Sequence, residues 1–203
     1  MEIRTDADQQ SVNALIQRAS FYRVAVPRAA VVAGIMSILA AAAISFAPRI
    51  LERQVRPREF AFVWIAVFLL ALAIKSWLSR EKASEPIVCE GKKVIRRAIL
   101  PNLVIPLMFT GWFITTGYLG AQELNLVVVW VAFYGLTLLS TSLFGPRSLV
   151  VLGWAFLLTS LAVPALIEVL DRYFSVNIPN FLMATTFGVY HLIYAACAWQ
   201  RKA

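Results

Sequence analysis

The sequence predicts an all-α, polytopic transmembrane helical bundle of six spans, preceded by a short amphipathic N-terminal helix. Three observations support this fold class. Apolar residues make up 60% of the 203 residues, whereas soluble domains contain roughly 45 to 50%. They gather in six runs, each close to the ~20 residues that a helix needs to cross a bilayer. The runs hold almost no charged residues, so lipid can surround them.

Short segments that carry most of the charge separate the six predicted spans. The spans cover residues 29–47, 60–78, 98–119, 124–144, 149–170 and 180–199. Pro101 and Pro106 are expected to interrupt the third span. No cleavable leader is apparent, so the first span is expected to act as the insertion signal. One transmembrane domain, 29–199, is therefore expected between a cytoplasmic region, 1–28, and a cytoplasmic tail, 200–203.

The positions of Lys and Arg predict the orientation. With the N-terminus inside, thirteen of the 19 basic residues lie on the cytoplasmic side, five lie on the opposite side, and Lys75 lies within the second span. The positive-inside rule therefore places both termini in the cytoplasm. Four arginines between the first two spans run against the rule. They are Arg49, Arg53, Arg56 and Arg58.

The segment before the first span, residues 5–23, is predicted to form an amphipathic helix. Leu15, Ile16 and Tyr22 fall on its apolar stripe. One interpretation is a helix that lies against lipid headgroups or the inner ends of the bundle. The other is a docking element for a cytoplasmic regulatory protein, bound as a helix in a groove.

A basic cluster precedes the third span on the predicted inner face. It consists of Lys92, Lys93, Arg96 and Arg97. Such a cluster attracts anionic lipid headgroups at about 1 kcal/mol per charge. Its other interpretation is a topology determinant that needs no further role. With the basic residues gathered between apolar runs, the net charge of +8 indicates contact with headgroups and no direct contact with nucleic acid.

His191, near the middle of the last span, is the only histidine of the chain. An ionisable residue at membrane depth suggests a functional site with a partner. We expect that partner to be Tyr134, a hydroxyl of residues 140–142, or Thr115 and Thr116. The alternative is a neutral imidazole whose hydrogen bond holds two helices together.

Further polar or aromatic residues in the third and fourth spans are candidates for a ligand site. Asn102, together with the prolines, suggests a broken helix that lines a cavity, as in transporters. The favoured alternative is an ordinary transmembrane helix, in which prolines are also frequent. Trp112 and Trp130 are placed to flank an apolar ligand, but buried packing is the favoured explanation. The candidate ligand-binding residues are therefore His191, Tyr134, Asn102, Thr115 and Thr116.

Sequence signals for catalysis are lacking. No Asp or Glu lies in the interior of a predicted span, and no hydrolase, zinc or phosphate-loop motif is present. Cys89 and Cys197 stand at unrelated positions, and one histidine supplies too few ligands for a metal within one protomer. We therefore expect a protein that is not an enzyme and that has neither a metal nor a cofactor; association of a quinone or a haem with His191 is the alternative that stays open.

Small residues recur at four-residue spacing in two of the spans. The first span carries Ala33, Ser37, Ala41 and Ser45, and the last carries Ala184 and Gly188. Small residues on one face let two helix backbones approach closely. We expect these faces to be packing surfaces between helices.

Two segments resemble a known group of proteins: Arg18-Ala-Ser-Phe-Tyr-Arg-Val-Ala-Val-Pro27, and Thr186-Phe-Gly-Val-Tyr-His191 followed by Arg201-Lys202. They are similar to an uncharacterised family of small, six-span bacterial inner-membrane proteins of about this length. Its members are often encoded beside winged-helix regulators, so the resemblance implies a membrane-bound partner of a transcription factor. It implies no catalytic residue, and only Gly188 and His191 match recurring positions.

These observations favour a non-enzymatic sensor or membrane tether. It would detect a membrane condition or an apolar ligand and report it to a cytoplasmic regulatory partner. A transporter or channel for a small solute is the first alternative, and a structural subunit of a larger membrane complex is the second. The sequence leaves open whether the chain forms a homo-oligomer.

Overall fold

The structure is a computed structural model of the chain. It describes residues 27–48, 50, 52, 55–80, 100, 102–112, 114–116, 123–141, 147–173 and 177–200. The regular structure of these residues is entirely helical, and five of the helices are long and apolar enough to cross a membrane. The expected helical bundle of a multi-pass membrane protein is confirmed to that extent. The predicted 5–23 helix and the basic cluster of 92–97 lie outside the described residues.

The helices follow the predicted spans closely. In chain order they are the first helix (Pro27–Pro48), α2 (Pro57–Arg80), the third helix (Asn102–Thr116), α4 (Glu123–Thr141), α5 (Arg147–Tyr173), and a last helix made of α6 (Ile178–Met183), η3 (Ala184–Tyr190) and α7 (His191–Gln200). The third helix is shorter than a full crossing, so the sixth span stays a prediction. Its described turns continue through Pro106, which agrees with an ordinary transmembrane helix and not with one broken at this proline.

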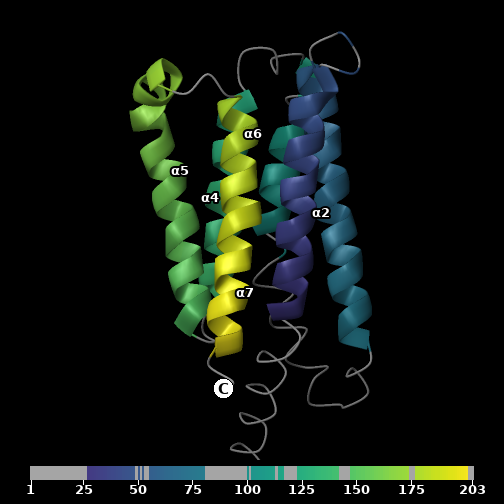
Figure 1. Ribbon diagram of the computed structural model, residues 1–203, viewed down its shortest axis with the longest axis vertical. Helices are drawn as coiled ribbons and strands as arrows, with labels where there is room; N and C mark the ends of the chain where they lie inside the picture. The colour runs from purple at the N-terminus through teal and green to yellow at the C-terminus, as the bar shows by residue number, and fades with distance from the viewer. Residues whose placement is uncertain are drawn as a thin grey trace, which may run out of the picture.

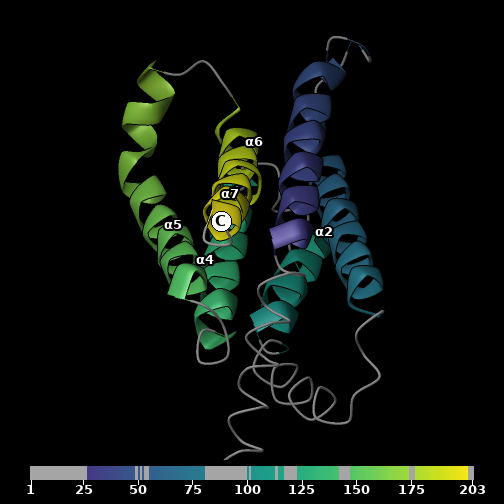
Figure 2. The ribbon, with the colours of Figure 1, turned by 60° about the horizontal axis from the view of Figure 1, so that its bottom comes forward.

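The helices alternate in direction. We call the end where the first helix begins and α7 ends the terminus end, and the opposite end the distal end (Figure 1). Figures 1 and 2 place α4, α5 and the last helix on one side of the bundle, and the first helix and α2 on the other. The third helix joins the two sides near the distal end. There, Phe109 and Ile114 pack against a small buried cluster of Ala61 from α2 and Leu126 from α4.

Two pairs of glycines allow two helix pairs to approach very closely. A Cβ atom added to Gly34 of the first helix would lie 3.0 Å from the carbonyl oxygen of Gly188 in η3. One added to Gly135 of α4 would lie 2.9 Å from the carbonyl oxygen of Gly153 in α5. Backbones in such contact gain dispersion energy along their whole crossing. These contacts hold the last helix on the first helix, and α5 on α4.

The expected small-residue stripe of the first helix serves two different purposes. Toward the distal end, the amide of Asn180 donates to the carbonyl oxygen of Ala41 and to the hydroxyl of Ser45, both at 2.8 Å. Toward the terminus end, Ala33 and Ser37 line a cavity. The expected packing surface is therefore present over the distal part of the stripe.

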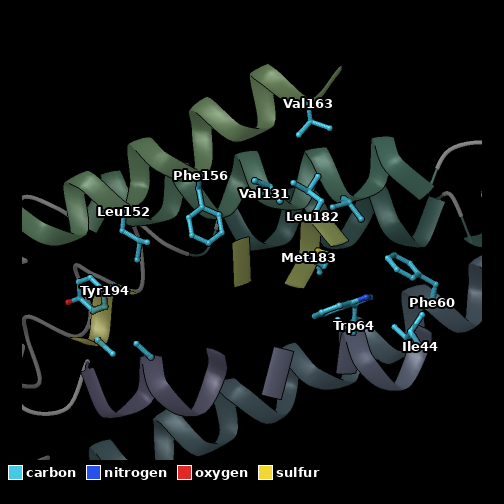
Figure 3. Close-up of a cluster of buried hydrophobic side chains, with 14 of the residues drawn as sticks. Ile44, Phe60, Trp64, Val131, Leu152, Phe156, Val163, Leu182, Met183 and Tyr194 are labelled. Carbon is cyan, nitrogen blue, oxygen red and sulfur yellow. The ribbon is translucent and has the colours of Figure 1, made fainter. Parts of the chain in front are cut away.

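Large apolar side chains fill the distal half of the bundle. Figure 3 shows Phe60, Trp64 and Ile44 meeting Met183 and Leu182 across the space between the two sides. Phe60 is 1% exposed and Trp64 is 2% exposed. This packing closes the bundle at its distal half, and the remaining free space lies toward the terminus end.

The outer surface carries many exposed apolar side chains. Leu39, Met108 and Leu161 each expose more than half of their surface, and every described helix that is long enough to span contributes at least one exposed large apolar residue. Soluble monomers rarely show contiguous apolar surface on this scale. The exposed face is therefore suited to lipid.

The last helix contains a π-helical segment that the sequence did not predict. Residues Ala184–Tyr190 form the wider helix η3 between two α-helical parts. Segments of this kind are rare and occur frequently at functional sites. η3 ends immediately before His191, so it sets the direction in which that side chain leaves the helix.

We expect Gly135→Ala to lower the free energy of unfolding by about 1 to 3 kcal/mol, the usual cost of overpacking. The new methyl group would meet the backbone of Gly153, which cannot move aside as a side chain can. Thermal or denaturant unfolding in one detergent–lipid mixture measures this change. Gly111→Ala is the matched control, because no described atom lies within 4 Å of the new methyl group. Equal stability of the two variants would contradict the close crossing.

Candidate functional site

The terminus half of the bundle encloses a cavity of about 290 Å³. Side chains from the first helix, α2, the third helix, α4, α5 and the last helix all line it. Trp64 and Met183 lie at its distal side, where the packed core begins, and Ala30, Leu149 and Tyr194 lie toward the terminus end. Because the wall includes every helical part of the bundle, a molecule in this cavity would touch all of them.

The described lining is mostly apolar. Among the described residues that form it there is no Asp, Glu, Lys or Arg, and eight side chains carry polar groups. The polar lining residues are Ser37, Asn102, Trp130, Tyr134, Thr137, His191, Tyr194 and Trp64. Ligand sites typically combine an apolar wall with a few such groups, which orient the ligand.

His191 and Tyr134 form the polar centre of the cavity. The Tyr134 hydroxyl and His191 Nε2 are 2.7 Å apart, and His191 is 5% exposed. The contact expected between these two residues is therefore present. If Tyr134 donates, Nε2 is the acceptor; if Nε2 carries the proton and donates, the Tyr134 hydroxyl is left to donate to a ligand.

Aromatic rings surround this pair. The ring of Tyr134 lies 4.9 Å from that of Phe156 and 5.0 Å from that of Phe187, between centroids. Phe187 stacks on His191 with an interplanar angle of 14°. Tyr190 meets Phe156 edge-on, while its hydroxyl lies 2.9 Å from that of Thr159. The rings fix the orientation of the pair and exclude water from it.

The two glycine crossings place this pair. Tyr134 precedes Gly135, and His191 lies one turn after Gly188. Each polar side chain therefore leaves its helix next to the point where that helix is held most closely to its neighbour. Side chains on such rigid positions keep their geometry better than side chains on loops.

Asn102 also lines the cavity, near the start of the third helix. Its amide donates to the hydroxyl of Ser140 at 3.2 Å. Ser140 is thus a partner of Asn102 and not of His191. Thr137, one turn before it, turns its hydroxyl back to the carbonyl of Phe133 at 2.8 Å.

Three other sequence-based candidates do not join the cavity. Thr115 and Thr116 donate to the carbonyl oxygen of Trp112, at 2.9 and 2.8 Å, and both are exposed. Trp112 is 54% exposed, so its expected place beside a ligand is wrong. A hydrogen bond to a carbonyl oxygen in the preceding turn of the same helix satisfies a threonine hydroxyl without any partner from another helix.

Trp130 and Trp64 supply the indole groups of the cavity wall. Trp130 Nε1 donates to Thr110 at 2.8 Å, and the Thr110 hydroxyl donates to the carbonyl oxygen of Pro106 at 2.6 Å. Trp64 Nε1 is buried and has no hydrogen-bond acceptor among the described residues. Sequence analysis had not singled out Trp64, Phe156 or Phe187, because nothing in a uniformly apolar run distinguishes the inward face from the lipid face.

The remaining expectations concern metals and partners. No group of His, Cys, Asp and Glu suited to a metal ion occurs among the residues that the structure describes. Cys197 is a free, exposed thiol on α7. The candidate partner and lipid contacts lie outside the described residues. They are Leu15, Ile16, Tyr22, Lys92, Lys93, Arg96 and Arg97.

Comparisons with known proteins identify no relative: no family model matches the chain, and neither the curated proteins nor the solved structures contain a significant match.

A double-mutant cycle with Tyr134→Phe and His191→Leu tests the pair. We expect a coupling of about 0.6 kcal/mol and at most about 1.7 kcal/mol, the range of interhelical hydrogen bonds in membranes. Unfolding free energies in lipid bicelles measure it. Tyr134→Phe combined with Asn180→Ala is the control, and it should be additive within about 0.5 kcal/mol because the two side chains share no partner. A coupling of zero in the first cycle would show that the contact adds no stability.

Proposed function

We propose that the protein is a non-enzymatic, six-span protein of the bacterial inner membrane that senses an apolar ligand. The observation that carries this proposal is the cavity, whose wall is uncharged, includes every helical part of the bundle and contains the buried Tyr134–His191 pair. A ligand in this position changes the packing of several helices at once. A ligand can act as a signal only if it binds one conformation of the bundle more tightly than another, and contact with several helices makes such a difference possible.

Two parts of the cavity wall lead directly to the segments that we assign to signalling. Ala29 and Ala30 line the cavity within the first turn of the first helix, next to the proposed 5–23 cytoplasmic helix. Five residues of α2 between Ile65 and Leu72 line it as well, and the basic cluster of 92–97 follows this helix along the chain. Movement of either helix would therefore reach a segment that faces the cytoplasm in the proposed topology.

The partner in this proposal is a soluble regulatory protein, for which the family resemblance suggests a winged-helix transcription factor. The 5–23 helix would bind it through the stripe of Leu15, Ile16 and Tyr22. Anionic headgroups would hold the basic cluster at the membrane surface. The chain itself would make no direct contact with nucleic acid.

Capture of the partner tests this function. The full chain, purified from its native host in detergent, should retain a soluble DNA-binding protein that a chain lacking residues 1–27 loses. The double variant Leu15→Glu/Ile16→Glu should lose it too, because charge on the apolar stripe prevents docking. Gln17→Glu, on the polar face of the same helix, is the matched control. Mass spectrometry identifies what is bound, and identical partner sets in all four preparations would sink the proposal.

Solute transport is the second candidate, and one observation favours it. The cavity lies in the terminus half, while Phe60, Trp64 and Met183 pack tightly at the distal half. A site that is closed on one side is what alternating access requires. Flux of a small neutral solute into proteoliposomes, abolished by His191→Ala or Asn102→Ala, would support a transporter over a sensor. Co-purification with other integral membrane proteins would instead indicate a structural subunit.

A further inference from the structure

The second half of α2 is the least packed wall of the cavity. Phe60, Ala61 and Trp64 in the first half are buried, whereas no residue between Ile65 and Ile74 is. Five residues of this stretch line the cavity. In both ribbon views, the C-terminal half of α2 stands away from the other helices (Figures 1 and 2). The cavity thus separates this half of α2 from the rest of the bundle.

Two residues of the wall are also exposed at the surface. Leu72 of α2 is 36% exposed and Leu107 of the third helix is 44% exposed, whereas every other lining residue is buried or half-buried. Next to them, Leu69 and Met108 expose 56% and 70% of their surface. α2 and the third helix share a buried cluster only near the distal end. The cavity therefore reaches the lipid-facing surface between these two helices.

We propose that this gap is a lateral portal through which the cavity takes a tailed quinone from the bilayer. The quinone ring would lie beside Tyr134 and His191, and its alkyl or isoprenoid tail would pass between Leu72 and Leu107 into the lipid. This inference rests on the proposed sensing function and names the chemical class of its ligand. It includes no electron transfer.

The charge and size of the cavity favour a neutral ring with a tail outside. A cavity of about 290 Å³ lies at the lower end of the roughly 300 to 1,000 Å³ of typical ligand sites. It holds one ring headgroup and leaves no room for a long tail. Among the described residues of its wall there is no Asp, Glu, Lys or Arg, and this disfavours phosphate and carboxylate headgroups, which need a positive partner in an apolar site.

The polar pair and the surrounding rings fit the quinone head. A quinone offers carbonyl oxygens that only accept hydrogen bonds. When His191 Nε2 carries the proton and donates to Tyr134, the Tyr134 hydroxyl is left to donate to such an oxygen. Phe187, Trp130 and Tyr134 supply flat aromatic surfaces beside that donor. Offset stacking on such rings stabilises a planar ligand.

Photo-crosslinking of the full chain in phosphatidylcholine nanodiscs tests the site. The probe is an azido-substituted quinone with a decyl tail, and decylubiquinone is the competitor. We expect saturable labelling of cavity residues that decylubiquinone abolishes and dodecane, which has a tail but no ring, does not. Tyr134→Phe should weaken binding about three- to tenfold, the equivalent of one hydrogen bond. Thr185→Val, which removes a hydroxyl of the last helix outside the described cavity wall, should leave the affinity unchanged.

The portal has its own test in the same nanodiscs. Excess decylubiquinone is added to complexes of the azido-quinone before irradiation, and the fall in cross-linking yield with the delay before irradiation gives the exchange rate. Leu72→Trp and Leu107→Trp should each slow exchange several-fold with little change in affinity, because they narrow the passage. Leu161→Trp, on the lipid face of α5 and away from the cavity, is the matched control. An unchanged exchange rate in both portal variants would overturn the lateral route.

The outcomes separate this inference from the proposed function. Absence of saturable labelling, equal competition by dodecane, or an unchanged affinity in Tyr134→Phe would each overturn the quinone site. None of these results bears on the capture of a cytoplasmic partner, which uses a different preparation and a different segment of the chain. If no cytoplasmic partner is captured but quinone binding is observed, the proposed sensing function is overturned and the quinone site stands.

Discussion

The close crossing of helix backbones at two glycine pairs is the contact on which the rest of the bundle depends. In lipid, apolar side chains gain nothing by leaving their surroundings, so helices are held by close packing and by hydrogen bonds. Gly34 with Gly188, and Gly135 with Gly153, provide that packing for two helix pairs. Tyr134 and His191 lie beside these crossings, so the same contacts that build the bundle also bring its polar pair together.

The sequence predicted where the helices lie along the chain better than it predicted which side of each helix faces the interior of the bundle. Span positions follow from run length, and the Tyr134–His191 contact follows from the scarcity of polar groups at membrane depth. Both Trp112 and Trp130 were expected to face inward; Trp130 does, whereas Trp112 faces outward. The sequence could not separate the two, since both stand in runs that are apolar on every side. The π-helical turn before His191 was equally hidden, because it changes hydrogen bonding without changing hydropathy.

Packing is unequal around the bundle, and this inequality has a physical origin. α4 and α5 cross at glycines, as do the first and last helices, whereas α2 contains no glycine and Val67, Phe68 and Ala71 of its second half line the cavity. The apolar side chains of such a segment interact about as favourably with lipid as with other helices. Little free energy therefore opposes movement of the segment away from the bundle. A wall of this kind can respond to an occupant, and rigid walls on the other sides keep the polar pair in place.

Selectivity in a cavity that reaches the bilayer has to come from its polar groups. An unfilled apolar cavity costs roughly 24 cal/mol per Å³ in soluble proteins, so lipid chains would enter this one whenever no ligand is present. Apolar contact alone then distinguishes a ligand poorly from the acyl chains that it displaces. A hydrogen bond to Tyr134 or His191 is something that an acyl chain cannot make. The pair is therefore the feature that converts a lipid-filled space into a site for one class of molecule.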